Sequence, residues 1–286
     1  MSGILYLCAT PIGNLEDITL RVIRTLKEVN LIAAEDTRHS IKLLNHFEIK
    51  TPMTSYHEFN KVDKARYLVE QLQAGQNIAL ITDAGTPGIS DPGEELVRQA
   101  YAANIEVTSL PGACAAVTAL TLSGLSTRRF CFEAFLPTDK KDRQRVLNEL
   151  KVETRTIILY EAPHRLNKTL RELYNNLGNR NVTVIKELTK KHETILQATL
   201  LEAADTFDHQ EPRGEYVLVL EGKSVKEIEE EIQEQWEAIT LTDHMKIYLN
   251  QGLNKKEAMK AVAKDRGISK RDIYQVLIKE GPLEME

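Results

Sequence analysis

The stretch TDAGTPGISDPG, residues 82–93, holds three glycines and two prolines and directly follows the apolar run NIALI. Glycine weakens helices and strands, and proline removes a backbone hydrogen-bond donor, so this composition is typical of a loop. Glycine also lets a ligand approach the main chain, while proline limits the entropy that a loop loses on binding. The stretch therefore predicts a ligand-binding loop at the end of a buried strand.

Short apolar runs alternate with amphipathic stretches on both sides of this loop. The runs that predict strands are 4–9, 31–35, 77–82 and 105–110. The patterns that predict helices are 18–29, 64–75 and 94–103. Gly75 stands where the C-terminus of a helix favours glycine. This alternation predicts an open, largely parallel sheet with helices packed on it.

The same alternation restarts after GLSTRR, residues 124–129. Strands are predicted at 130–136, 154–161, 181–188 and 214–222, and helices at 140–151 and 165–177. A chain of 286 residues exceeds what one hydrophobic core usually supports. We therefore expect the α/β class, with an N-terminal domain over 1–118 and a second domain over 119–222.

Residues 223–286 differ in character from the two predicted domains. Residues 225–243 carry seven acidic residues against one lysine, and residues 254–279 carry eight basic residues against three acidic ones. Capping-box patterns at Asn254 and Ser269, with Gly267 at the turn, predict two helices in the basic part. We interpret this region as an acidic linker followed by a helix-turn-helix-like tail.

The overall composition, 42% hydrophobic and 28% charged with a net charge of −5, is that of an ordinary soluble protein. Cys8, Cys114 and Cys131 are scattered without metal-ligand spacing, so we expect reduced core thiols and no metal. The chain shows no basic leader and no apolar run near the roughly 18 residues that a membrane span needs. We expect a cytoplasmic protein with no membrane association.

Three further strand-exit loops are small and rigid: 9–14, 110–116 and 211–214. Ligands of α/β sheets bind at the carboxyl ends of strands, where such loops cluster. A phosphate cradle is one alternative, but neither the P-loop pattern nor GxGxxG occurs and no lysine follows these loops. A neutral or cationic ligand fits better, with Asp83 as the nearest carboxylate. The alternative for Asp83 is that it only stabilises a turn.

Three long motifs carry a resemblance to a known family: residues 5–47, residues 83–93 and residues 110–137. They resemble the ribosomal RNA small subunit methyltransferase I family, which belongs to the tetrapyrrole methylase fold class (class III methyltransferases). The similarity runs across residues 4–222 and includes ILYEAPHRL and EPRGEYVLVLEG. The basic tail is similar to the C-terminal helix-turn-helix region of that family.

The resemblance implies two α/β domains with S-adenosylmethionine bound between them, in a homodimer. It implies 2′-O-methylation of a cytidine in the decoding region of 16S ribosomal RNA, with the assembled small subunit as substrate. A site of main chain and few charges suits a sulfonium donor, because it does not over-stabilise the ground-state cation. The expected cofactor-binding residues are Pro11, Gly13, Asp83, Gly85, Ile89, Pro111, Gly112, Ala113, Cys114, Tyr160 and Gly214.

A general base would accelerate attack by a ribose hydroxyl by about 10²–10⁴-fold, but the sequence does not assign one. The candidates are Asp36, Glu161 and His164, with His57 a further histidine of the same kind. The alternative for Asp36 is a helix cap, and a lone histidine is commonly only hydrogen-bonded.

Cations near these loops and in the tail are the expected RNA contacts. They are Arg38, Arg128, Lys140, Lys141, Arg143, Arg165, Lys255, Lys256, Lys270 and Arg271. Arg38 lies in a first helical turn, where the helix dipole disfavours a cation, which suggests an RNA phosphate. The alternatives are a solvated helix face for residues 137–145 and a packing surface for the tail, although excess positive charge favours phosphate contact.

Two other functions stay open on the sequence alone. The first is a small-molecule methylase of the same fold acting on tetrapyrroles, against which the basic segments argue. The second is a non-catalytic ribosome-binding adaptor that keeps the fold.

Overall fold

The computed structural model describes residues 1–280, apart from seven side chains near the C-terminal end. Those side chains belong to Glu229, Ile232, Glu237, Val276, Leu277, Lys279 and Glu280. The chain forms two compact units, one of Met1–Leu150 with Arg155–Glu221 and one of Lys151–Thr154 with Gly222–Glu286. The expected domain limits at residues 118 and 222 stay predictions.

The first unit begins with a five-stranded sheet in which every neighbouring pair is parallel. Its strands are β1 (Ile4–Cys8), β2 (Leu31–Ala34), β3 (Met53–Ser55), β4 (Ile78–Ile81) and β5 (Glu106–Leu110). Their spatial order is β3-β2-β4-β1-β5. The four strands expected in this half are confirmed, whereas β3 was not expected because it is only three residues long.

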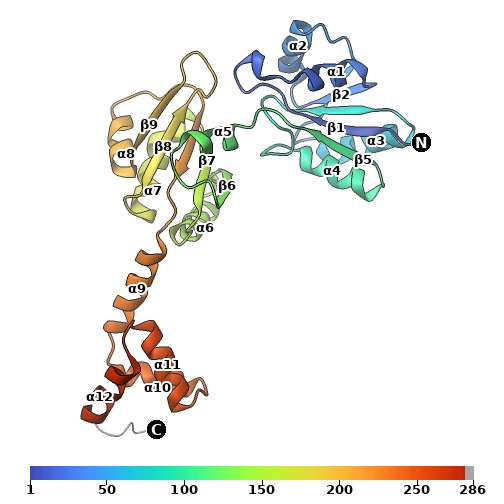
Figure 1. The fold of residues 1–286 in the computed structure, drawn as a ribbon. Helices are drawn as coiled ribbons and strands as arrows, with labels where there is room; N and C mark the ends of the chain where they lie inside the picture. The colour runs from blue at the N-terminus through green and yellow to red at the C-terminus, as the bar shows by residue number, and fades with distance from the viewer. Residues whose placement is uncertain (281–286) are drawn as a thin grey trace. The chain divides into compact units, whose positions relative to one another are not determined.

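Helices cover both faces of this sheet, as Figure 1 shows. They are α1 (Leu20–Glu28), α2 (Thr37–His46), α3 (Lys61–Gln73) and α4 (Gly93–Ala102), with a short 3-10 helix, η1, at Leu15–Asp17. α1 and α2 pack on one face through Val22, Leu26 and Leu44, and α3 and α4 pack on the other. Gly75 follows α3 with φ +92°, which confirms its place at the helix end.

The second sheet of the first unit is mixed rather than parallel. Its strands are β6 (Phe130–Phe135), β7 (Thr156–Glu161), β8 (Asn181–Lys186), β9 (Thr194–Thr199) and β10 (Tyr216–Leu220). In the order β6-β7-β10-β8-β9 only β6 and β7 run parallel. β9 escaped the sequence analysis because it is an edge strand with several exposed residues.

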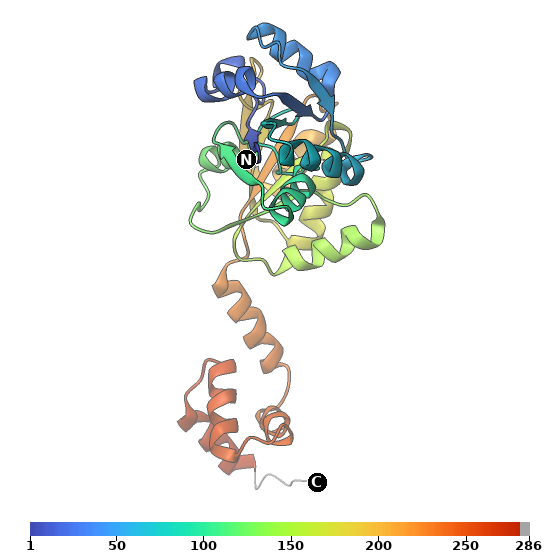
Figure 2. The same cartoon turned by 90° about the vertical axis from the view of Figure 1, so that its right-hand side faces the viewer.

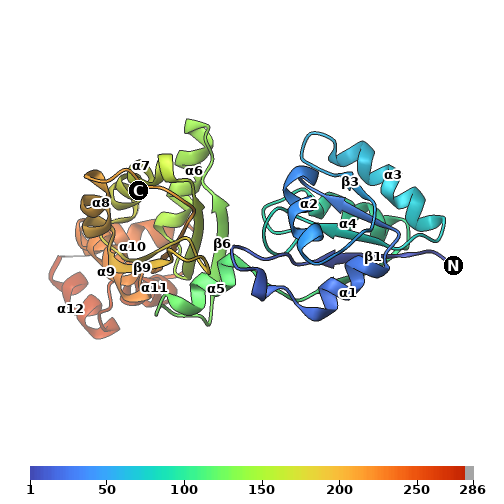
Figure 3. The same cartoon turned by 90° about the horizontal axis from the view of Figure 1, so that it is seen from above.

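The helices on this second sheet are α5 (Ala115–Leu122), α6 (Lys140–Lys151), α7 (Leu166–Leu177) and α8 (Leu200–Asp208), with a 3-10 turn, η2, at Pro163–Arg165. α5 packs on one face through Ala116, Ala119 and Leu120. α6, α7 and α8 pack on the other face, with α7 and α8 side by side in Figure 3. The predicted α/β class with two sheets is therefore confirmed.

The second unit is helical, with α9 (Val225–Glu237), α10 (Leu241–Asn250), α11 (Lys255–Asp265) and α12 (Lys270–Glu280). The last three gather around a small core that includes Met245, Val262 and Ile273, and Figure 2 shows them as one group. Both capping boxes of the basic part form, and Gly267 makes the turn at φ +61°. These two helices are confirmed.

The acidic stretch, interpreted from the sequence as a linker, is helical in the structure. It forms α9 and the start of α10. A capping box between Ser224 and Glu227 marks the N-terminus of α9. Trp236 stacks on the buried His244 ring, with the ring centroids 3.8 Å apart. Arg266, one of the basic residues of the tail, is 9% exposed and donates to His244 Nδ1. It therefore stabilises the interior of the unit and does not add to its surface charge.

No helix among residues 1–280 combines the length and the apolar character needed to cross a bilayer.

Candidate functional site

Three strand-exit loops of the first sheet are joined by hydrogen bonds. The amide of Thr10 donates to the Gly85 carbonyl at 2.9 Å, and the Gly85 amide donates back at 3.1 Å. Thr86 Oγ1 then donates to the Ala113 carbonyl at 2.9 Å. The loops after β1, β4 and β5 therefore form one surface.

Two glycines of these loops, Gly85 and Gly112, stand where the neighbouring loop crowds the position of a side chain. A Cβ on Gly112 would lie 2.6 Å from the Cβ of Ala9. Gly85 has φ +86°, and a Cβ there would lie 3.1 Å from Ile12 Cγ2 and 3.4 Å from the Ala113 carbonyl oxygen. Because glycine has no Cβ, glycine at both positions lets the loops pack closely against one another.

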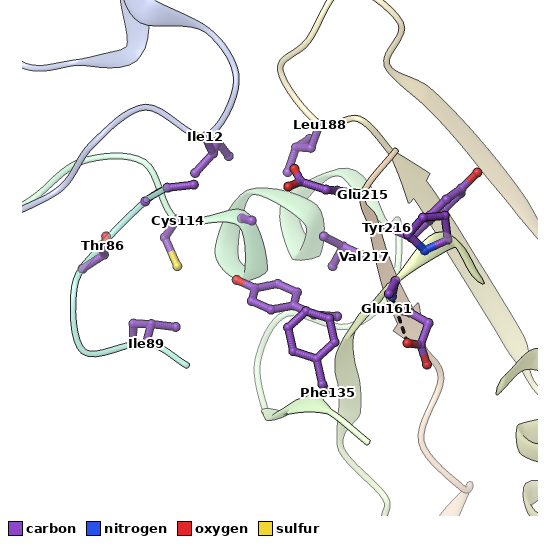
Figure 4. Close-up of a pocket in the computed structure, with 16 residues that line it drawn as sticks. Ile12, Thr86, Ile89, Cys114, Phe135, Glu161, Leu188, Glu215, Tyr216 and Val217 are labelled. Atoms are coloured by element: carbon purple, nitrogen blue, oxygen red, sulfur yellow. Dashed lines mark hydrogen bonds between the residues drawn. The ribbon is translucent and has the colours of Figure 1, made fainter. Parts of the chain in front are cut away.

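A cavity of about 370 Å³ opens beside this surface. Its lining comes from both sheets: Ile12, Ala84, Gly85, Thr86, Ile89, Cys114, Ala115, Phe135, Tyr160, Glu161, Ala162, Pro163, Leu188, Glu215, Tyr216 and Val217. Figure 4 shows Ile12, Thr86, Ile89 and Cys114 on one side and Phe135, Leu188 and Val217 on the other. The lining contains no lysine or arginine, and its size is in the range of small-molecule sites.

An aromatic cluster forms part of the wall on the second sheet. The Tyr160 ring packs edge-on against Phe132 and Phe135, with ring centroids 4.9 Å and 5.7 Å away. The Ala116 amide, at the N-terminus of α5, donates to the Tyr160 hydroxyl at 3.1 Å. Burial raises the pKa of Tyr160 to about 12, so the hydroxyl stays protonated at neutral pH.

One rim of the cavity carries a charged network. Lys190 Nζ lies 2.9 Å from Glu187 Oε1 and 2.8 Å from Glu215 Oε2. The hydrogen bond from Lys190 lowers the pKa of Glu187 below its usual value. Gly13 and Gly214 approach this network, since a Cβ on either would lie 2.4–2.6 Å from Lys190 or Glu187 atoms.

Some of the expected cofactor residues line the cavity and others lie beside it. Gly85, Ile89, Cys114 and Tyr160 line the cavity. Gly112 and Ala113 belong to the joined loops, and Pro11 lies in the loop after β1. Pro111 is exposed just before Gly112. Cys114 is therefore not the core thiol that was expected, whereas Cys8 and Cys131 are buried. That any of them binds a cofactor stays a prediction.

Asp83 lies next to the cavity without lining it. Its Oδ1 accepts a hydrogen bond from the Asp36 amide at 3.1 Å, which ties the loop after β4 to the loop after β2. Partial burial raises the pKa of the Asp83 carboxyl above its usual value. This contact links two loops, and both the cofactor-binding role of Asp83 and the turn-stabilising alternative stay predictions.

Of the three candidate bases, two are held by hydrogen bonds and the third does not line the cavity. Asp36 caps α2 by accepting from the Arg38 amide at 2.8 Å, and the Arg38 side chain lowers the pKa of the Asp36 carboxyl. Glu161 is 2% exposed and accepts from Thr169 Oγ1 at 2.5 Å and from the Ala162 amide at 2.9 Å. His164 is exposed in η2 and does not line the cavity. The geometry favours structural roles for Asp36 and Glu161.

The predicted RNA-contacting cations differ in their exposure. Arg38, Arg128, Lys140, Lys141, Lys255, Lys256, Lys270 and Arg271 are exposed. Arg143 is 7% exposed, with Nε 2.5 Å from Glu172 Oε2 and an N–H donated to Thr169. Arg165 is partly buried and donates to the Leu136 carbonyl at 2.6 Å. Arg143 and Arg165 thus hold the segment after β6 in place, and their burial and pairing argue against the prediction that they bind RNA.

Sequence reasoning missed Phe135, Leu188 and Glu215, which all line the cavity. Leu188 carries no motif by which it could have been found, whereas Glu215 lies within EPRGEYVLVLEG but was not singled out. Phe135 could have been found only by noticing that FCFEAF places three phenylalanines out of strict alternation.

No group of three or more potential metal ligands occurs among residues 1–280.

The fold is that of a class of methyltransferases. The family model of the tetrapyrrole (corrin/porphyrin) methylases matches residues 5–204. Among solved structures, diphthine synthase superposes with a TM-score of 0.62 at 13% identity, over 78% of this chain and 91% of that one. Uroporphyrin-III C-methyltransferase from Thermus thermophilus, in complex with S-adenosylhomocysteine, gives 0.55 at 20% identity, over 77% and 97%. These likenesses concern the fold.

Sequence relatives narrow the class. Ribosomal RNA small subunit methyltransferase I of Halalkalibacterium halodurans is 50% identical over 97% of this chain and 96% of its own length. The proteins of that name in Synechocystis and Bacillus subtilis are 50% and 47% identical over 96% and 95% of this chain, and over 97% and 93% of their own. The chain belongs to this family of S-adenosylmethionine-dependent methyltransferases, within the tetrapyrrole methylases.

Proposed function

We propose that this enzyme methylates the ribose 2′-hydroxyl of a cytidine in the decoding region of 16S ribosomal RNA. The assembled small subunit is the substrate in this proposal, and S-adenosylmethionine is the methyl donor. The single observation that carries the proposal is similarity at about 50% identity, over nearly the whole chain, to proteins named for small-subunit RNA methylation.

The cavity fits the cofactor. Its walls are bare peptide around Gly85 together with apolar and aromatic side chains, and Glu161 and Glu215 are its only ionisable carboxylates. No lysine or arginine belongs to this lining, and the charge of Lys190 at the rim is paired with Glu187 and Glu215. Bound S-adenosylmethionine supplies an electrophilic methyl group, and the sulfur of the cofactor loses its positive charge when that group is transferred.

The residues of this chain contribute mainly position. The joined loops at Thr10, Gly85 and Ala113 fix one wall, and the Tyr160 hydroxyl is fixed by the Ala116 amide. A rigid cavity that holds two reactants in line can supply an effective molarity of about 10⁵ M or more. Because Asp36 and Glu161 are held in hydrogen bonds, our proposal rests on positioning and on few charges near the donor rather than on a general base.

Exposed cations provide the RNA-binding surfaces in this proposal. On the first unit these are Arg38, Arg128, Lys140 and Lys141, and on the second unit they are Lys255, Lys256, Lys270 and Arg271. Phosphate contacts by such residues position an RNA without reading its sequence. Binding that depends on them weakens steeply as the salt concentration rises.

We further propose a cytoplasmic homodimer. In support, α5 and the face of the second sheet that it covers expose Val117, Leu122 and Ile195, each at least 39% accessible. Light scattering coupled to gel filtration measures the mass directly. A mass near 32 kDa, that of one chain, would refute the dimer.

The test of the function is methyl transfer to small subunits purified from a strain that lacks the corresponding gene. With radiolabelled S-adenosylmethionine, we expect label in 16S RNA at a single cytidine ribose, and far less label on free RNA. Label in a tetrapyrrole substrate instead would favour the small-molecule alternative. Cofactor binding without any transfer would favour the adaptor.

A further inference from the structure

Strand β6 contains an irregularity that reorients its last residues. Phe132 pairs with Ile158 and Ala134 with Leu159, so Glu133 is an extra residue that has no partner of its own on β7. Ala134 adopts φ +51°, a left-handed conformation that is uncommon outside glycine. Bulges of this kind commonly re-aim a side chain beside a functional site.

The consequence of the bulge is the placement of Phe135. Residues of a strand alternate between faces, so Phe132 and Phe135 would lie on opposite faces of a regular strand. With the extra residue, Phe135 pairs with Tyr160 and joins Phe132 and Tyr160 on the face that carries the cavity. The chain thus adopts a strained backbone, and the result is a phenylalanine at the cavity.

The Phe135 ring is supported but not covered. Tyr160 contacts it edge-on, with ring planes 62° apart, and Tyr160 is itself fixed by the Ala116 amide. Phe135 nevertheless stays 49% exposed. Figure 4 shows the ring at the edge of the cavity, opposite Ile89. An apolar ring that is rigidly held and half-exposed offers a flat surface to a ligand.

The chain that follows Phe135 is positively charged at its surface. Lys140 and Lys141 open α6 and are exposed, and neither forms an ion pair within the part of the chain that the structure describes. The segment between is anchored, because the Leu136 carbonyl accepts from Arg165 and the Pro137 carbonyl from Arg143. Exposed aromatic rings beside cations are the elements with which proteins bind unpaired nucleotides.

We propose that Phe135 is a substrate-binding residue that stacks on the base of the acceptor nucleotide, while Lys140 and Lys141 contact neighbouring phosphates. The proposal rests on the proposed function, because it needs an RNA acceptor at this cavity. A stacked base holds its nucleotide at the cavity rim, so that the ribose hydroxyl reaches the bound methyl donor. Stacking tolerates any base, and Phe135 therefore contributes position and affinity rather than sequence specificity.

The test compares three single variants of the full-length protein. Phe135→Leu removes the ring but keeps an apolar side chain, and Phe135→Trp keeps a stacking surface. Phe130→Leu is the matched control, since Phe130 is the 42%-exposed residue at the other end of the same strand and does not line the cavity. Each variant is assayed for kcat/KM on small subunits and for the Kd of S-adenosylhomocysteine by calorimetry.

We expect Phe135→Leu to lower kcat/KM by about 5- to 150-fold, the range measured for loss of one base-stacking contact. The Kd of S-adenosylhomocysteine should change less than twofold, and Phe135→Trp and Phe130→Leu should keep kcat/KM within about threefold of the unaltered protein. Unchanged kcat/KM in Phe135→Leu would overturn the proposal. An equal loss of cofactor affinity would overturn it as well, by assigning the ring to the cofactor.

Failure of the proposed function gives a different result. In that case the unaltered protein itself transfers no label to RNA, and both proposals fall together. If the unaltered protein labels RNA and only the Phe135 variants behave otherwise than expected, the stacking proposal alone is wrong.

Discussion

Replacing Gly85 by alanine tests whether the joined loops form the cofactor site, and Gly88 provides a matched control. Both glycines lie in the loop after β4 with nearly equal torsions, φ +86° and +87°. An L-residue in this left-handed region costs about 1–2 kcal/mol. The shared torsion should therefore lower the free energy of unfolding of both variants by a similar amount, and any further loss in Gly85→Ala comes from the contacts of its new methyl group.

The two substitutions differ in what the new methyl group meets. At Gly88 a Cβ has no atom within 4 Å, whereas at Gly85 it lies 3.1 Å from Ile12 Cγ2 and 3.4 Å from the Ala113 carbonyl oxygen. Ile12 lines the cavity and must move by a few tenths of an ångström. We expect Gly85→Ala to weaken S-adenosylhomocysteine binding at least tenfold, about 1.4 kcal/mol, and Gly88→Ala to change it less than twofold.

The assays are calorimetric titration with S-adenosylhomocysteine and thermal unfolding of the ligand-free proteins. A fall in Tm of a few degrees for both variants corresponds to the shared backbone strain. The reasoning is refuted if both variants lose affinity equally, since strain of the loop would then explain the loss. It is also refuted if Gly85→Ala binds like the unaltered protein.

The remaining predictions concern three other features. Ala134→Gly relieves the strain of the left-handed torsion but adds chain flexibility, so the free energy of unfolding measured in urea should change by less than about 1 kcal/mol. Ala134→Val should lower the free energy of unfolding by more than about 2 kcal/mol, and equal effects of the two substitutions would contradict the strained bulge. Asp83→Ala should weaken cofactor binding in calorimetry by freeing the loop at Asp36, and Asp83→Asn, which keeps an acceptor, should bind more tightly than Asp83→Ala. Replacing Lys255, Lys256, Lys270 and Arg271 together by alanine should reduce the slope of log K against log salt for small-subunit binding by up to about 3; an unchanged slope would make the tail a packing surface.

The sequence was informative where a local pattern determines the structure. The buried runs IALI and ILYLC predict β4 and β1 because four or five consecutive apolar residues fill the centre of a covered sheet. The glycine-rich loops follow from these strands. Gly75 and the Asn254 capping box identify helix ends because a backbone requirement selects the residue type.

Features that depend on distant residues were missed. α5, with the sequence AAVTALTL, has no charged face, so it shows no amphipathic period. α9 was interpreted as a linker because its composition is acidic, although a capping box and the ion pair of Lys226 with Glu230 support a helix. Strand direction in the second sheet depends on crossovers, which apolar runs do not encode.

The candidate site, too, could be predicted from the sequence only in part. The loops around Gly85 and Gly112 are recognisable in the sequence because they are unusual in composition. Phe135 is not recognisable, because the bulge that directs it to the cavity contains alanine rather than glycine. The burial of Arg143 and Glu161 follows from contacts with Thr169 on α7 that no local pattern reports.

The most direct test of the central claim is a crystal structure of this protein bound to S-adenosylhomocysteine. We predict the ligand in the 370 Å³ cavity, with its sulfur between the loops at Gly85 and Ala113 and the aromatic wall at Tyr160. Density for the ligand at any other site, with this cavity unchanged, would contradict the account.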